Sequence, residues 1–152
     1  MKVQSFHIKC ERYLKLFTTY AYAWKCGVNP PPNSEKLSCL FDTGSDIGII
    51  NIDTANRMGL QRSDLMSEYY TAGGSTLADH YMADICLPGG MVFKNQWFRG
   101  SDVPIDIIVG MDIMTLGEMS FRYQNPYLEM SFTSDKYDLY LPILGDGLGI
   151  KF

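Results

Sequence analysis

The chain has 152 residues, of which 46% are hydrophobic and 20% charged, and its formal net charge at pH 7 is −4. This composition excludes a wholly disordered protein, and the lack of any block of basic residues argues against a nucleic-acid partner. The length fits one domain over residues 1–152. No apolar run approaches the roughly 20 residues that span a bilayer, and the N-terminus lacks the apolar core of a signal peptide. We therefore expect a cytoplasmic protein with no membrane partner.

The four cysteines are scattered, with no C-x-x-C pair. Cys39 and Cys86 fall in apolar stretches, where a reduced thiol behaves as a small hydrophobic side chain. His7 and His80 are isolated, so local spacing assembles no tetrahedral zinc site. We expect reduced core cysteines, no metal and no cofactor.

The N-terminal third of the chain has a strand pattern that is interrupted by prolines. Alternation over Tyr13–Trp24 predicts a long strand, for which Val3–Lys9 is the candidate partner. Three consecutive prolines within Asn29–Ser34 predict a loop. Lys36–Phe41 is the next predicted strand.

An Asp-Thr-Gly-Ser motif, Asp42–Ser45, lies between that strand and a second apolar run, Ile47–Ile50. A carboxylate at the end of a buried strand is costly unless it has a partner or a function. No other aspartate is followed by Thr-Gly or Ser-Gly. A reaction that needs two such carboxylates would therefore need a second copy of the chain.

The rest of the chain predicts short strands with one or two short helices. Asp53–Met58 is a candidate helix, with Asn51 or Asp53 as its cap and Gly59 at its end. The later elements are expected at Met66–Ala72, Ser75–Leu87, Met91–Phe98, Ile105–Val109, Asp112–Leu116 (a helix), Met119–Tyr123, Leu128–Phe132 and Leu148–Phe152. Short strands at this spacing are typical of an all-β barrel or sandwich.

Three motifs in this order resemble the retropepsin-like aspartic proteases, the single-lobed family that includes the retroviral enzymes. They are Asp42–Ser45, the glycine hairpin Thr71–Thr76 and the segment Ile107–Met114. The resemblance covers a core of about 37–132, with N-terminal strands in 1–29 and a C-terminal extension in 133–152. It implies an all-β fold, the closed β-barrel of the acid proteases, with one or two short helices and one lobe per chain.

The resemblance implies a role for each residue of the Asp-Thr-Gly-Ser loop. Asp42 would be the catalytic acid, paired with the same residue of a second copy. Thr43 would lock the two loops together, and Gly44 would let the backbone approach the substrate. Ser45 would hydrogen-bond the carboxylate and fix its orientation.

The hairpin tip Ala72, Gly73 and Gly74 would form a flap that opens for a peptide and closes to exclude water. The alternative is an ordinary turn whose glycines only supply positive φ.

Ile108, Val109 and Gly110 would pack beneath the active-site loop. Asp112 could be a second acid, but a structural carboxylate at a helix N-terminus is the favoured interpretation. His80 is favoured as a half-exposed strand residue rather than as a ligand.

Together these features predict a homodimeric aspartic endopeptidase that cleaves extended, apolar-flanked peptide segments. Its pockets would be lined by residues such as Ile47, Ile50, Ile107 and Val109. The alternative is a non-catalytic dimeric peptide-binding or scaffold module with the same fold. A sugar-kinase-like or actin-like ATPase is excluded because it would need two large α/β domains. In the retroviral branch terminal strands interleave in the dimer, and both termini are candidates for this here.

Overall fold

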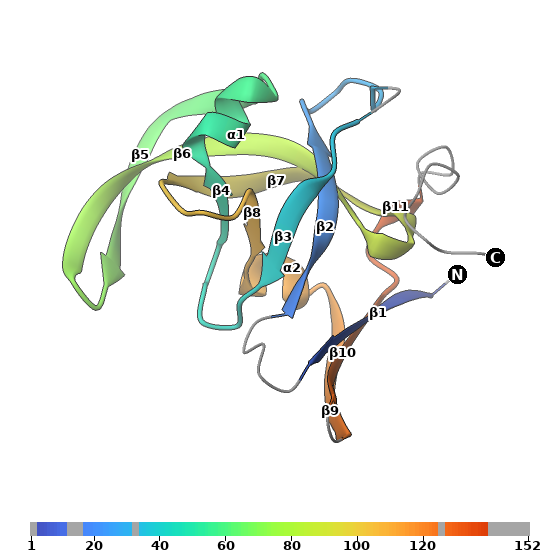
Figure 1. Ribbon diagram of the computed structural model, residues 1–152. Coiled ribbons are helices and arrows are strands. Elements are labelled where there is room, and N and C mark those ends of the chain that lie inside the picture. Colours follow the sequence, from blue (N-terminus) through green and yellow to red (C-terminus); the bar gives the residue numbers. More distant parts are fainter. Residues whose placement is uncertain (1–2, 12–16, 32–33, 125–126, 140–152) are drawn as a thin grey trace.

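The computed structural model describes residues 3–11, 17–31, 34–124 and 127–139. Among them, strands form two sheets, and the short helices lie at the ends of strands (Figure 1). The predicted final strand Leu148–Phe152 lies outside the described residues. None of the helices described is long and apolar enough to cross a bilayer.

The larger sheet closes into a barrel. Its strands are hydrogen-bonded in the order β7-β4-β8-β3-β2-β6, and β6 pairs again with β7 to complete the ring. The bounds are β2 (Phe17–Trp24), β3 (Leu37–Phe41), β4 (Gly48–Asn51), β6 (Gly74–Leu87), β7 (Met91–Ser101) and β8 (Ile107–Val109). β5 (Gln61–Thr71) extends the barrel beside β6, and β11 (Asp138–Leu139) pairs with β7. The prediction of a closed all-β barrel is confirmed.

Two α-helices, α1 (Ile52–Arg57) and α2 (Met111–Met114), and a 3-10 turn, η1 (Pro88–Gly90), occur among the described residues. At the start of α1, the Asn51 side chain accepts a hydrogen bond from the backbone N–H of Thr54 at 3.0 Å. This satisfies a donor that the first helical turn leaves unpaired. The predicted cap and the predicted number of helices are both confirmed.

A second, three-stranded sheet has the order β1-β10-β9, formed by β1 (Gln4–Glu11), β10 (Tyr127–Ser134) and β9 (Gly117–Gln124). The prediction that the first strand pairs with the second is wrong, because both edges of β2 are taken by β3 and β6. Instead, β1 runs antiparallel to β10, with Phe6 opposite Phe132 and Ile8 opposite Met130. All four side chains are buried, so this register places the apolar face of β1 in the core.

One continuous core joins the two sheets. The Phe6 ring lies 5.4 Å from the ring of Phe41 in the barrel and 5.7 Å from that of Phe132 in the smaller sheet. Cys39 and Cys86 are fully buried free thiols in the barrel strands, as the sequence predicts. The contact between Phe6 and Phe41 fixes the smaller sheet against β3, the strand that ends just before Asp42.

Candidate active site

The carboxylate of Asp42 is half-buried and lies directly after β3. The backbone N–H of Gly44 donates to its Oδ1 at 2.8 Å, and the Ser45 hydroxyl donates to its Oδ2 at 3.1 Å. A Cβ at position 44 would lie 3.1 Å from Asp42 Oδ1, so a side chain there would press on the carboxylate. The loop therefore holds both carboxylate oxygens in one orientation.

The segment that joins β8 to α2 packs against this loop and forms backbone hydrogen bonds with it. Val109 C=O accepts from the N–H of Asp42 at 3.0 Å, and the N–H of Met111 donates to Ser45 C=O at 2.8 Å. A Cβ at Gly110 would lie only 2.7 Å from the carbonyl carbon of Ile47. Glycine at position 110 is what allows the two backbones to approach this closely.

Asp112 continues the same support, in the first turn of α2. Its Oδ2 accepts from the N–H of Gly48 at 3.2 Å, and its Oδ1 accepts from the N–H of Ile113 at 2.9 Å. Burial raises the pKa of this carboxyl, and the charge of Asp46 adds to the effect, while the backbone donors oppose it. These contacts agree with the structural interpretation of Asp112 rather than with a second acid.

The predicted pocket lining is largely wrong. Ile50, Ile107 and Val109 are fully buried in the core and present no surface to a substrate, and Ile108 is only 8% exposed. β8 pairs with β3 on one side and β4 on the other, and all three of its residues are buried. Ile47 is half-buried and is the member of the predicted set that remains near the surface.

Asp106, just before β8, is an anchor that the sequence analysis missed. Its carboxylate accepts from the N–H and the hydroxyl of Ser38 at 2.8 and 2.9 Å and from the Thr54 hydroxyl at 2.6 Å. Partial burial raises its pKa, but these donors and the nearby Arg57 outweigh that effect, so its pKa lies below the ordinary value. Nothing in the local sequence distinguishes this aspartate from other acids beside apolar runs.

The predicted flap lies at the tip of the β5–β6 hairpin, which projects from the barrel (Figure 1). Ala72, Gly73 and Gly74 are all exposed, and Gly74 has a φ of +116°. The Thr71 hydroxyl accepts from the N–H of Gly73 at 3.2 Å and donates to Gly74 C=O at 3.1 Å. Among the described residues, no hydrogen bond links this tip to the loop at Asp42.

Arg99 on β7 contacts both the hairpin and the active-site loop, and no sequence motif predicts this role. Its side chain is only 11% exposed, and its guanidinium lies 4.2 Å from the centre of the Tyr69 ring on β5. One terminal nitrogen lies 3.6 Å from Asp46 Oδ1, beside the Asp-Thr-Gly-Ser motif. Its Nε is buried and has no hydrogen-bond partner among the described residues.

A hollow of about 260 Å³ lies where the active-site loop meets the smaller sheet. It is lined by Phe17, Leu40, Phe41, Asp42, Thr43, Met119, Phe121 and Met130. The lining places Asp42 and Thr43 in the same hollow as β9 and β10. The edge strand of the smaller sheet therefore adjoins the candidate active-site loop.

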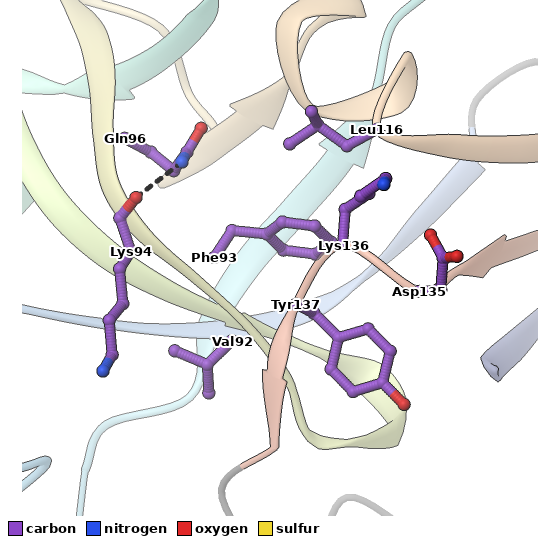
Figure 2. A pocket seen from close by; sticks show the side chains of 8 residues that line it. All are labelled: Val92, Phe93, Lys94, Gln96, Leu116, Asp135, Lys136 and Tyr137. Atoms are coloured by element: carbon purple, nitrogen blue, oxygen red, sulfur yellow. Dashed lines mark hydrogen bonds between the residues drawn. The ribbon is translucent and has the colours of Figure 1, made fainter. Parts of the chain in front are cut away.

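Figure 2 shows another hollow, of about 350 Å³, whose lining does not include the loop residues. Phe93 and Tyr137 are among its lining side chains, and the Gln96 amide donates to Lys94 C=O at 2.7 Å. This hollow is therefore separate from the Asp-Thr-Gly-Ser loop.

In the described part of the chain, no three His, Cys, Asp or Glu side chains are grouped so that they could hold a metal ion.

Comparison with known proteins defines the class. The signature of the family described as aspartyl protease matches residues 31–113, more than half of the chain, so the chain belongs to the aspartyl protease family. The match contains the Asp42 loop, the β5–β6 hairpin and Gly110. No curated protein matches the sequence.

Solved structures support the same fold. A retropepsin-like aspartic protease from Rickettsia conorii superposes with a TM-score of 0.57 at 20% identity, covering 88% of this chain and 96% of that one. The EIAV protease, solved with the inhibitor HBY-793, gives 0.51 at 21% identity, covering 70% of this chain and 91% of that one. The prediction of an aspartic endopeptidase with a retropepsin-like fold is confirmed.

Proposed function

We propose that the chain works as a homodimeric aspartic endopeptidase in which Asp42 of each copy supplies one carboxylate. The observation that carries this proposal is the single Asp42 carboxylate, oriented through both oxygens by Gly44 and Ser45. The sequence contains one Asp-Thr-Gly-Ser motif. A two-fold axis beside the loop would bring two Asp42 side chains together in one site.

The chemistry follows from the repulsion between two close carboxylates. At about 3 Å apart they cannot both ionise, so they share a proton. The ionised Asp42 takes a proton from a water molecule, and the protonated Asp42 polarises the scissile carbonyl. The water then attacks the carbonyl carbon, without an acyl-enzyme intermediate.

The neighbouring residues take supporting roles in this proposal. Ser45 holds the Asp42 carboxylate in orientation, and Gly44 keeps its surroundings free of a side chain. Thr43 is exposed beside Asp42, where the partner's loop would meet it. Ile108, Val109 and Gly110 hold the loop from below.

The substrate would be an extended peptide held between the loop and the β5–β6 hairpin, adding as a strand. The tip at Ala72, Gly73 and Gly74 would close over it. Tyr70 is 81% exposed and Leu77 is 65% exposed beside this tip. These large uncovered side chains support a preference for apolar residues in the substrate.

The test is cleavage of a mixed peptide library between about pH 4 and 7, where a shared-proton pair has one carboxyl protonated. Asp42→Asn should abolish cleavage while the protein stays folded and dimeric. Asp53→Asn is the matched control, because Asp53 is exposed in the first turn of α1. Activity should rise faster than linearly with enzyme concentration.

Residual cleavage by Asp42→Asn would refute the assignment of Asp42. A dimer that binds library peptides without cutting them would instead support the non-catalytic binding module.

A further inference from the structure

β9 is one of the two edge strands of the smaller sheet. Among the described residues β9 pairs only with β10, at the end of the order β1-β10-β9 (Figure 1). The opposite edge strand, β1, contacts η1 near its start, where the Gln4 side-chain amide donates to Gly89 C=O at 3.1 Å. An uncovered edge strand readily pairs with another strand.

The two faces of β9 differ in chemistry. Glu118, Ser120 and Arg122 are exposed on one face and alternate with apolar residues on the other. On the apolar face Phe121 is 52% exposed, although its ring lies 5.3 Å from that of Phe17. In the described part of the chain, neither Glu118 nor Arg122 forms an ion pair.

The apolar face of β9 also adjoins the candidate active site. Met119 and Phe121 line the same 260 Å³ hollow as Asp42 and Thr43. A second chain that paired with β9 would therefore lie next to the loop that, under the proposed function, must meet its copy. This proximity distinguishes β9 from the other strand edges, including that of β5, which lies in the hairpin beyond β6.

Symmetry restricts how β9 can pair with itself. A two-fold axis perpendicular to the sheet makes the strands antiparallel and must pass beside one residue that faces its own copy. If that residue is Ser120, Glu118 lies opposite the partner's Arg122, and the partner's Glu118 lies opposite Arg122. On the other face, Met119 lies opposite the partner's Phe121, and Phe121 opposite the partner's Met119.

The neighbouring registers lose this match. Centred on Met119, the pairing sets Glu118 against the partner's Ser120. Centred on Phe121, it sets Arg122 against the partner's Ser120. Opposite charges across a strand pair stabilise it, as do apolar pairs, so the register centred on Ser120 satisfies both faces at once.

We propose that β9 is the dimer seam, paired antiparallel with β9 of a second copy and centred on Ser120. This inference rests on the proposed function, which requires the second copy, and it names the surface and register that bring that copy in. The result is a continuous sheet in the order β1-β10-β9-β9-β10-β1, with its apolar face beside both Asp42 loops. In this arrangement β1 stays paired with β10 of its own chain and does not exchange with the second copy.

A charge exchange tests the register. Glu118→Arg alone or Arg122→Glu alone would place like charges opposite each other twice per dimer, and either should weaken dimerisation about 10-fold or more. The double variant Glu118→Arg/Arg122→Glu restores opposite charges and should recover the dimer dissociation constant to within about 3-fold. Sedimentation equilibrium measures these constants, and the single-variant effects should shrink in high salt.

Glu68→Arg is the control for the charge change itself. Glu68 is an exposed strand residue on β5, outside the proposed seam, so the substitution should leave the dissociation constant unchanged. Circular dichroism checks that each variant folds.

A cross-link tests the centre of the register. Directly opposite residues in an antiparallel pair have Cβ atoms about 4.5–5.5 Å apart, so Ser120→Cys should join two copies through a disulfide. Diamide is the oxidant: it accepts two electrons and two protons as the two thiols form the bond. Ser131→Cys is the matched control, because Ser131 faces Ser120 from β10 and would lie about 14 Å from its own copy. The unsubstituted protein measures background from native cysteines.

The outcomes separate this inference from the proposed function. Weakened single variants, a restored double variant and a cross-link through position 120 support the seam. A dimer that ignores both single charge changes and gives no cross-link at position 120 overturns the seam, while dimeric cleavage dependent on Asp42 still stands. A fully active monomer overturns the seam and the proposed dimer together.

Discussion

Two glycine-containing turns of this molecule, the loop after β3 and the tip of the β5–β6 hairpin, differ in how closely the rest of the chain packs against them. The loop from Asp42 to Gly48 forms hydrogen bonds with Val109, Met111 and Asp112 and leaves no room for a side chain at Gly110. The tip of the β5–β6 hairpin is exposed and held by bonds within itself. The comparison suggests a division between a fixed floor and a free lid, which suits a site that must orient a carboxylate and still admit a peptide.

The largest effect should come from filling the space at Gly110. Gly110→Ala places a Cβ 2.7 Å from the backbone of Ile47, so the loop must move. The φ of Gly110 is −97°, which any residue adopts, so the cost comes from this contact alone. We expect kcat/KM to fall about 100-fold, since displacements of about 1 Å in a catalytic group have that effect. The melting temperature should fall as well.

Gly73→Ala makes the same substitution at the tip. Its Cβ would have nothing nearer than the Thr71 hydroxyl at 3.7 Å, so stability should stay within about 0.5 kcal/mol. If Gly110→Ala proved as active and stable as Gly73→Ala, the loop would not depend on the close approach of the β8–α2 segment.

The secondary structure around the active-site loop and the hairpin tip was predictable from the sequence. The apolar strand before Asp42, the hairpin around Gly73 and Gly74, and the Asn51 cap each depend on residues close together in the chain, and all are present. Periodicity and turn chemistry carry that information.

The predictions that failed concern strands and side chains whose contacts lie far away in the sequence. The first two strands looked like neighbours, but the apolar face of β1 is completed by β10, which is more than a hundred residues later. The apolar run at Ile107–Val109 could not reveal that β8 is enclosed between β3 and β4, with all three of its residues buried. Asp106 and Arg99 act through side-chain contacts across strands, for which a single sequence has no periodic signal.

Asp106→Asn should have the next largest effect, a loss of stability in the barrel region beside β3 rather than at the hairpin tip. The substitution removes the charge that Ser38, Thr54 and Arg57 surround, and should cost about 2 kcal/mol of unfolding free energy at pH 7. Because folding lowers the pKa of Asp106, its stabilisation is present above the unfolded value of about 4 and is lost as pH falls through the folded value.

Urea unfolding at pH 7 and pH 3 measures this difference. The gap between the unsubstituted protein and Asp106→Asn should narrow at pH 3, because protonation removes the same charge. Asp102→Asn, at an exposed position, should change stability by less than about 0.5 kcal/mol at either pH. A gap that stayed constant with pH would show that the carboxylate charge does not provide the stabilisation.

A smaller effect than those of Gly110→Ala and Asp106→Asn is expected at Arg99, which contacts both the hairpin and the residue after the Asp-Thr-Gly-Ser motif. Arg99→Met keeps much of the side-chain volume but removes the cation between Tyr69 and Asp46. The change in stability should be about 1 kcal/mol or less. The loss of the cation–π contact is offset by the removal of a buried charge whose Nε has no hydrogen-bond partner in the part of the chain that the structure describes. We expect KM to rise several-fold with a smaller change in kcat, since the hairpin would be less often positioned over the loop.

A double-mutant cycle decides whether Arg99 acts through the hairpin. Tyr69→Leu removes the ring under the guanidinium, and if the two residues act together, the double variant should be no worse than the poorer single variant. Arg62→Met is the matched control, because Arg62 is 61% exposed and pairs with Asp79 near the base of the same hairpin. Fully additive effects on KM would mean that Arg99 and Tyr69 act separately, and that the floor and the lid move independently of this contact.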